Sequence, residues 1–194
     1  MPLARCLAAT VVALAVLAPG ASAEDGTGCP EREFAPVFGA FEDLGLYTLA
    51  PGGNFEDGAG GWTLDARATV VPESSTILLG PSLGAASLEL APGASATTPT
   101  ICVESGFRSF RLAARSSGEE PGELDTDVVY DADDAKYAGR EWPGAAWGVT
   151  RRLSLAQGRF LARGDGAGTV RIRFTAAGGP VRIDDVYVDP RFRG

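Results

Sequence analysis

Apolar and polar residues alternate with a period of two along much of this 194-residue chain, and this pattern limits the folds open to it. In the segment 169–175, Val170, Ile172 and Phe174 alternate with Arg171 and Arg173. Successive side chains of a strand point to opposite faces, so such a segment is a strand with one buried face. The same alternation occurs in 62–71, 87–90, 109–115, 124–130 and 147–155.

Turn residues separate these segments. Gly, Pro, Asp and Ser gather at 51–53, 92–95, 116–123, 131–134, 164–168 and 176–180. Short alternating segments between such turns are typical of an all-β, antiparallel β-sandwich. We expect one domain over residues 24–194, with an irregular lead-in over residues 24–46. In segment 62–71 we expect a single strand, with Trp62 at the start of its apolar face.

The first 23 residues have the features of a secretory signal peptide. Arg5 precedes an apolar run from Leu7 to Leu17, and the small residues of Ala21-Ser22-Ala23 follow a Pro-Gly break. This order is what a signal peptidase cuts, and the run is short for a membrane span. We therefore expect cleavage after residue 23 and a secreted, extracellular protein without membrane insertion.

The charge of the mature chain is strongly acidic. Loss of Arg5 leaves 16 basic and 25 acidic residues, a net charge of −9. A surface of that charge argues against a nucleic-acid partner and against anionic lipid.

Two cysteines, Cys29 and Cys102, remain after removal of the signal peptide, which contains Cys6. Paired cysteines are usual in exported proteins, so we predict a disulfide between Cys29 and Cys102. Such a bond would attach the lead-in to the strand that contains Cys102 and make it part of the domain.

Catalytic chemistry is restricted because the chain contains no His. This excludes Ser-His and Cys-His nucleophiles and His-ligated zinc. One enzymatic alternative remains in the stretch "ELDTD". On a strand, Glu123, Asp125 and Asp127 share one face, as the carboxylates of a jelly-roll glycosidase do. The competing interpretation is a solvated outer face of a strand, and we favour it because the last position is an Asp, which is short for the acid of such an enzyme.

Both ends of the mature chain resemble a known family. "GGNFEDGAGGWTL" near the start and "VRIDDVYVD" at the end are similar to the terminal strands of carbohydrate-binding modules of the family 4, 9 and 22 type. Further features of the chain are the early Cys29, the stretches "NFEDGAGGW", "GASATTPTICV" and "FRSFRLAARSSG", the isolated Trp147 and the ending "RIDDVYVDP". With these features the chain as a whole also resembles a group of secreted actinobacterial proteins without an established activity. Asn54 stands where the modules usually have a Gly. The resemblance implies a jelly-roll topology for the sandwich.

It also implies a structural calcium ion where the first and last strands meet. Glu56 matches one ligand of the modules, and Asp184 or Asp185 matches another. The spacing of Ile183 and Val186 is odd, so a bulge near the two aspartates is needed to bury both apolar side chains. Oxygen ligands without a nearby His or thiolate favour calcium over transition metals. The alternative is that Asp184 and Asp185 pair with surface arginines.

Sugars bound to these modules lie against exposed aromatic rings. We expect Tyr130, Tyr137 and Trp142 in or near a polar loop over residues 130–147, and we take them as candidate ligand contacts. Trp62 and Trp147 begin apolar segments, and we expect both in the core. The sequence thus leaves two hypotheses open. One is a secreted binding module for a polysaccharide or cell-envelope glycan, and the other is a structural or interaction domain of the cell envelope without a sugar site.

Overall fold

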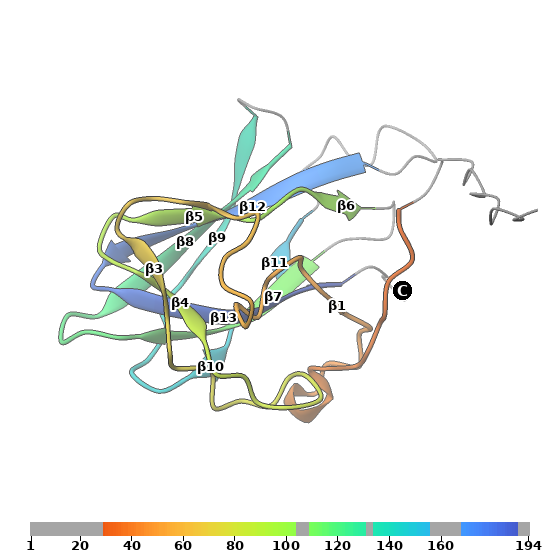
Figure 1. The fold of residues 1–194 in the computed structure, drawn as a ribbon, viewed down its shortest axis with the longest axis horizontal. Helices are drawn as coiled ribbons and strands as arrows, with labels where there is room; N and C mark the ends of the chain where they lie inside the picture. Colours follow the sequence, from red (N-terminus) through yellow and green to blue (C-terminus); the bar gives the residue numbers. More distant parts are fainter. Residues whose placement is uncertain (1–28, 104–108, 131–133, 156–167, 190–194) are drawn as a thin grey trace, which may run out of the picture.

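Two antiparallel sheets lie face to face in the computed structural model, which describes residues 29–103, 109–130, 134–155 and 168–189 (Figure 1). Sheet I has the strand order β10-β7-β13-β4-β3, with β1 paired to β13 and β11 paired to β7. Its strands are β1 (Thr48–Leu49), β3 (Ala68–Val71), β4 (Ser87–Leu90), β7 (Ser109–Ser116), β10 (Gly148–Val149), β11 (Leu153–Ser154) and β13 (Val181–Asp189). All of its strand pairs are antiparallel.

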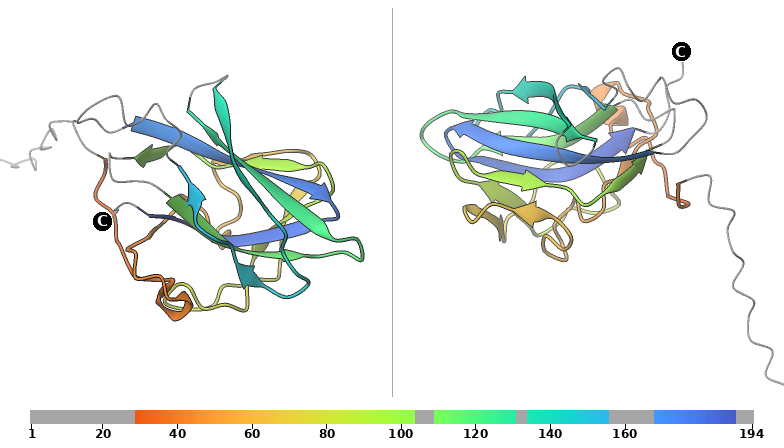
Figure 2. Two further views of the ribbon diagram at one scale, coloured as in Figure 1. Left: turned by 180° about the vertical axis from the view of Figure 1, so that it is seen from behind. Right: turned by 90° about the horizontal axis from the view of Figure 1, so that it is seen from above.

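Sheet II has the order β2-β5-β12-β8-β9, with β6 paired to β12. Its strands are β2 (Thr63–Leu64), β5 (Ser95–Thr97), β6 (Ile101–Val103), β8 (Gly122–Val129), β9 (Ala135–Glu141) and β12 (Gly168–Gly178). Its strand pairs are antiparallel too. These findings confirm the predicted antiparallel β-sandwich, and both layers are visible from two further directions in Figure 2.

The main core fills the space between the two sheets. Phe110 of sheet I and Phe174 of sheet II are fully buried, and their ring centroids lie 6.1 Å apart. Val170 and Ile172 join this core, as the alternation in 169–175 predicts. Burial of each such side chain contributes roughly 1.5–3 kcal/mol.

A second, smaller core lies on the outer side of sheet I, under the lead-in. Phe38 of the lead-in and Tyr47, which directly follows the lead-in, pack against Ala113 of β7 and Tyr187 of β13. The short 3-10 helix η1 (Gly39–Phe41) belongs to this segment and lies beside the loop at 72–86 in Figure 1. Strand β7 is therefore buried on both faces, although its sequence alternates like that of a half-buried strand.

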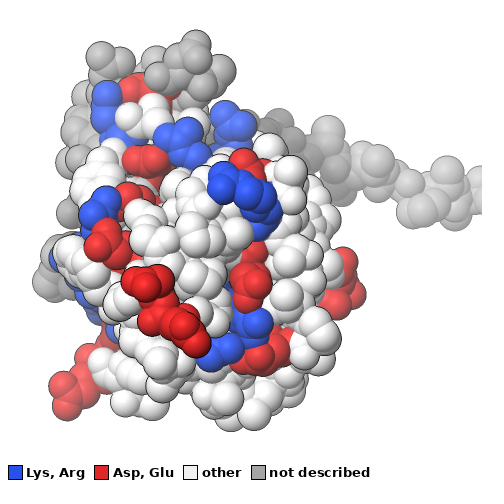
Figure 3. Space-filling view, turned by 90° about the vertical axis from the view of Figure 1, so that its left-hand side faces the viewer, with Lys and Arg blue, Asp and Glu red and all other residues white. Residues whose placement is uncertain are grey.

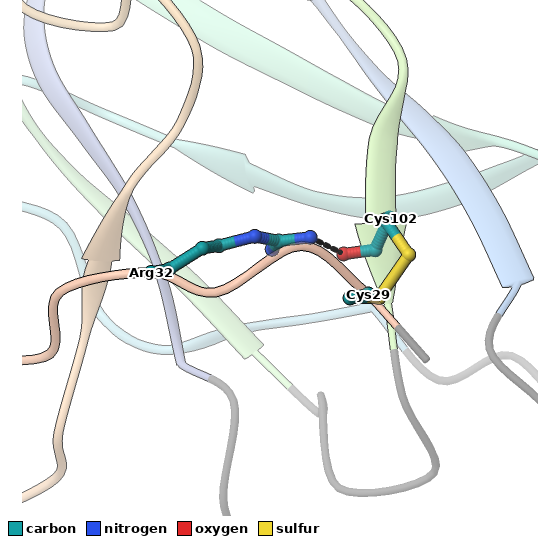
Figure 4. The surroundings of a disulfide bond; sticks show 3 residues. All are labelled: Cys29, Arg32 and Cys102. Carbon is teal, nitrogen blue, oxygen red and sulfur yellow. Dashed lines mark hydrogen bonds between the residues drawn. A yellow bond between two sulfur atoms is a disulfide. The ribbon is translucent and has the colours of Figure 1, made fainter. Parts of the chain in front are cut away.

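The disulfide between Cys29 and Cys102 is present and joins residues 73 positions apart (Figure 4). Arg32 donates a hydrogen bond from Nη2 to the carbonyl oxygen of Cys102, at 2.8 Å. The disulfide prediction is confirmed, and the beginning of the described lead-in is attached to β6.

Segment 62–71 corrects one sequence-based prediction. It does not form one strand, because β2 belongs to sheet II and β3 to sheet I. The chain turns between them at Asp65, whose carbonyl accepts a hydrogen bond from the Ala68 N–H, and Ala66 in the turn is exposed. A crossing from one sheet to the other preserves the alternation of apolar residues, so the pattern alone does not show it.

Two further predictions were wrong in part. Residues 135–141 form strand β9 and not a loop, and residues 131–133 lie outside the described part of the chain. Trp62 is buried in the main core as predicted, but Trp147 is half-buried and packs against the smaller core outside sheet I. The guanidinium of Arg115 lies 5.8 Å from the centre of its ring.

Candidate functional site

The outer face of sheet II carries three carboxylates in the register that the sequence predicts. Glu123, Asp125 and Asp127 lie on one side of β8 and are half-buried, while the residues between them point into the core. We call the surface formed by these carboxylates and the outward residues of β9 and β12 the carboxylate face.

Arginines from both neighbouring strands neutralise the carboxylates. Arg140 of β9 donates to Asp125 and to Glu123, each at 2.6 Å. Arg173 of β12 donates from Nη2 to Asp127 at 2.7 Å. The hydrogen bond from Arg140 lowers the pKa of Asp125. Asp127, the position that would supply the acid of a glycosidase, accepts hydrogen bonds from both Nε and Nη2 of Arg173.

Tyr137 and Trp142 are the two most exposed aromatic residues in the described part of the chain, with 57% and 69% of their surface accessible. Tyr137 lies in β9 opposite Asp127, and its hydroxyl donates to Asp125 at 3.4 Å. Trp142 follows β9 directly. Two of the three predicted contact residues thus border the carboxylate face.

Tyr130, the third candidate, has different surroundings. It is half-buried against the main core, and its hydroxyl donates to the carbonyl of Leu155 at 2.6 Å. Its ring is thus less accessible to a ligand than the rings of Tyr137 and Trp142.

Charges of both signs are mixed over the surface. Figure 3, which views the molecule from the left-hand side of Figure 1, shows Lys and Arg side chains beside Asp and Glu side chains. The acidic net charge of −8 therefore does not translate into a uniformly acidic surface on this side.

A second polar cluster lies where the Gly-rich segment 53–61 approaches the loop at 72–86. Phe55 has a positive φ of 57° and is fully buried, and the next residue, Glu56, is exposed. Its carboxylate accepts hydrogen bonds from the N–H groups of Ala85 (2.9 Å) and Ala86 (3.0 Å). A side chain at Gly84 would collide with this carboxylate, so the glycine is required for the contact. Glu56 holds one end of the loop.

Strand β13 reaches the same loop through a bulge. Its pairing with β7 shifts register between Asp184 and Tyr187, and Ile183 and Val186 are both fully buried. This confirms the bulge that the odd spacing predicts. Val186 exchanges backbone hydrogen bonds with Ala50 (2.8 Å) and Gly53 (3.0 Å), so the bulge is also where β13 meets the beginning of the Gly-rich segment.

Asp184 holds the other end of the loop. Its Oδ2 atom accepts hydrogen bonds from the Ser74 hydroxyl (2.9 Å) and the Ser75 N–H (2.8 Å). Neither Asp184 nor Asp185 forms an ion pair with an arginine among the described residues. The surface ion pairs weighed as an alternative for the two aspartates are therefore not found there.

Asp185 differs from its neighbour in its partners. It adopts a positive φ of 51°, and within the described residues no group donates a hydrogen bond to its carboxylate. Burial raises the pKa of Asp184 to about 6. Burial and the charge of Asp184 raise the pKa of Asp185 to about 7, and Glu56 adds to both shifts.

These three carboxylates do not make a complete metal site by themselves. Over residues 29–103, 109–130, 134–155 and 168–189, no three His, Cys, Asp or Glu side chains are placed to hold a metal ion together. Glu56 and Asp184 already accept hydrogen bonds from the loop, which leaves Asp185 as the carboxylate most available to a cation. Backbone carbonyls or water would have to supply the other ligands.

Neither the arginines of the carboxylate face nor the hydrogen-bond donors of the loop at 72–86 could be found from the sequence pattern. Arg140 and Arg173 occupy outward positions of alternating strands, which is a signal for exposure and not for a partner. Ser74, Ser75 and the N–H groups of residues 85 and 86 lie in a segment without periodicity. No local pattern connects them to Glu56 and Asp184.

Comparisons with known proteins identify the fold but not a family. No protein-family model matches the chain, and no curated protein matches it. Among solved structures, the chain is similar to the CBM22-1 xylan-binding domain of a Paenibacillus barcinonensis protein, with 14% identity and a TM-score of 0.50 over 72% of this chain and 93% of that one. It is also similar to the K1 cleaved adhesin domain of Lys-gingipain from Porphyromonas gingivalis W83, with 12% identity and a TM-score of 0.50 over 72% of this chain and 96% of that one.

Both likenesses show a shared jelly-roll sandwich, in agreement with the predicted fold class. At these identities they show the fold alone.

None of the helices in the described residues has the length and apolar character needed to span a membrane.

Proposed function

We propose that this chain is a secreted, non-catalytic carbohydrate-binding module, and that a glycan lies along the carboxylate face against Tyr137 and Trp142. The observation that carries the proposal is the exposure of these two rings, 57% and 69%, beside a face of paired charges. Burial of apolar side chains is favourable, so large rings left in water at one edge of a face are typical of a binding surface.

The chemistry of the face suits a sugar. Flat aromatic rings pack against the apolar faces of pyranoses, and sugar hydroxyls need donors and acceptors close by. The paired groups of Arg140, Asp125 and Glu123 offer both along β8 and β9. The similarity to a xylan-binding module supports this proposal at the level of the fold.

A polysaccharide pull-down with three variants tests it. Tyr137→Ala and Trp142→Ala should each reduce retention on the polysaccharide that the wild-type protein binds. Phe41→Ala is the matched control, because Phe41 is an exposed aromatic residue of η1, away from sheet II. Unchanged retention of both β9 variants would contradict the proposed site, and a wild-type protein that binds no polysaccharide would contradict the function.

A calcium ion near Asp185 is the second part of the proposal. Three carboxylates lie close enough that Glu56 raises the pKa of both aspartates, and a bound cation would relieve this repulsion. Asp185 would be a ligand, and the ion would connect β13 to the loop at 72–86. The ion would stabilise the fold and would not contact the glycan, because Glu56, Asp184 and Asp185 do not belong to sheet II.

A structural or interaction domain without a sugar site is the competing function. The similarity to an adhesin domain supports it to the same degree, since that likeness is also one of fold. The same pull-down separates the two functions, because an interaction domain without a sugar site would give no retention for the wild-type protein or any variant.

A further inference from the structure

Arg171 differs from every other arginine of the described residues. The other nine donate a hydrogen bond or ion pair to a carboxylate or a backbone carbonyl: Arg32, Arg67, Arg111, Arg115, Arg140, Arg151, Arg152, Arg173 and Arg182. The guanidinium of Arg171 forms no hydrogen bond or ion pair within the described part of the chain, although the residue is half-buried. A guanidinium that is partly desolvated and unpaired is a candidate for a ligand contact.

The position of Arg171 places it on the carboxylate face. It lies two residues before Arg173 in β12, so both side chains are on the outer side of sheet II. Across the sheet, Arg173 is opposite Asp127, which is opposite Tyr137. Tyr137 therefore lies two strands away from Arg173, and Arg171 is displaced from Arg173 by two residues along β12. The spacings of a sheet put the Cα atoms of Arg171 and Tyr137 about 12 Å apart.

The ion pairs of this face leave one arginine without a partner carboxylate. Its carboxylates are Glu123, Asp125 and Asp127, and two arginines engage all three of them. Arg171 is the remaining cation. A guanidinium matches the fork geometry of a carboxylate, so the group it suits best is an anionic group of the ligand.

We infer that the glycan taken by this face carries isolated carboxylate groups, as a uronic acid does, and that Arg171 binds one of them. This inference rests on the proposed function, because it names the substrate class of the same site. Arg171 is one unpaired cation on a chain of net charge −8. It therefore favours a glycan whose carboxylates are widely spaced, because the acidic groups of the protein would repel a densely charged polyanion.

The test compares glucuronoxylan, a neutral backbone with spaced glucuronate groups, with the same polymer after reduction of its carboxyl groups. Wild-type protein should bind glucuronoxylan about ten-fold or more tightly than the reduced polymer, because a hydrogen bond to a charged group contributes that much. Arg171→Ala should abolish this difference and keep the binding of the reduced polymer. Arg171→Lys keeps the positive charge but loses the two parallel donors of the guanidinium, so it should retain part of the difference in affinity.

Arg67→Ala is the charge-matched control. Arg67 lies in the turn between β2 and β3 and pairs with Asp65, so its loss should change neither affinity. A thermal melt of each variant checks that it is folded. Equal binding of the two polymers, or no effect of Arg171→Ala, would overturn the inference and leave the proposed function intact. Absence of binding to these and to a panel of neutral polysaccharides would overturn the proposed function itself.

Discussion

Arg111 in the central strand β7 donates a hydrogen bond from Nη1 to Asp43 of the lead-in, at 2.8 Å, and both side chains are buried. Tyr47 and Arg152 donate to the same carboxylate, and Arg111 also lies over the ring of Phe38. Burial by itself would raise the pKa of Asp43, but these donors outweigh it and hold the pKa well below its usual range. This buried ion pair attaches the lead-in to the outer face of sheet I.

Asp43→Ala should therefore lower the free energy of unfolding by about 3–5 kcal/mol, because it leaves the charge of Arg111 buried without a partner. Arg152→Ala is the comparison, since the side chain of Arg152 is half exposed and its pairing should contribute less than about 1 kcal/mol. Urea unfolding measures both changes. Equal, small effects of the two substitutions would contradict the role assigned to Asp43.

The disulfide should make a separate contribution. Cys29 and Cys102 close a loop of 73 residues, for which the chain-entropy model gives roughly 4 kcal/mol. The double substitution Cys29→Ser and Cys102→Ser should lower the melting temperature, and mass spectrometry without reductant should find no free thiol at either position in the wild-type protein. A melting temperature unchanged by the double substitution would show that the bond adds no stability.

Replacement of Trp62 and replacement of Trp142 should have very different effects on the free energy of unfolding. Trp62 is buried, contacts Phe55 at a centroid distance of 4.9 Å and donates to the Pro51 carbonyl, so Trp62→Ala should cost about 3–5 kcal/mol. Trp142 is 69% exposed, so Trp142→Ala should stay within about 0.5 kcal/mol. Chemical unfolding of both variants checks this. A large loss for Trp142→Ala would place its ring among structural contacts.

Calcium binding makes a prediction about chelation. If an ion is bound to the folded state alone, EDTA should lower the melting temperature of the wild-type protein by mass action. Glu56→Gln and Asp185→Asn should each remove this sensitivity. Asp185→Asn is the cleaner variant, because Glu56 also holds the N–H groups of Ala85 and Ala86 and its loss would disturb the loop. Identical wild-type melting curves with and without EDTA would refute the calcium proposal.

The two aspartates of the bulge also predict a pH dependence in EDTA. The pKa of Asp184 is about 6 and that of Asp185 about 7, both above the ordinary value of 3.8. The folded state therefore binds these protons more tightly than the unfolded state. The resulting stabilisation is fully present below pH 3.8 and is lost as the pH rises through about 6 to 7.

Asp185→Asn removes one of these titrations and suits the positive φ of 51° at this position, which Asn tolerates. Its stability relative to the wild-type protein should increase between about pH 4 and pH 8, as measured by urea unfolding in EDTA. If the difference in stability between Asp185→Asn and the wild-type protein stays constant over this range, the pKa of Asp185 is not raised in the folded state.

Local sequence was sufficient for the faces of individual strands. Val170, Ile172 and Phe174 point into the core because side-chain direction in a strand follows from the backbone of that strand alone. The bulge near Asp184 was predictable for the same reason, since the odd spacing of Ile183 and Val186 allows no regular strand to bury both. The disulfide followed from the two cysteines that remain after the predicted signal peptide.

Tertiary structure decided which segments meet. The same alternation is compatible with one strand or with two strands in different sheets, so the division of segment 62–71 between sheets II and I depends on the partners that β2 and β3 find in β5 and β4. Likewise, the alternation predicts that an arginine on the outer face of a strand is exposed, but it does not show whether another segment covers that face. Arg111 is buried because the lead-in packs over it, Arg140 is neutralised by β8, and Arg171 is left unpaired on the same face. Such contacts join residues far apart in the chain, and a periodicity of two carries no information about them.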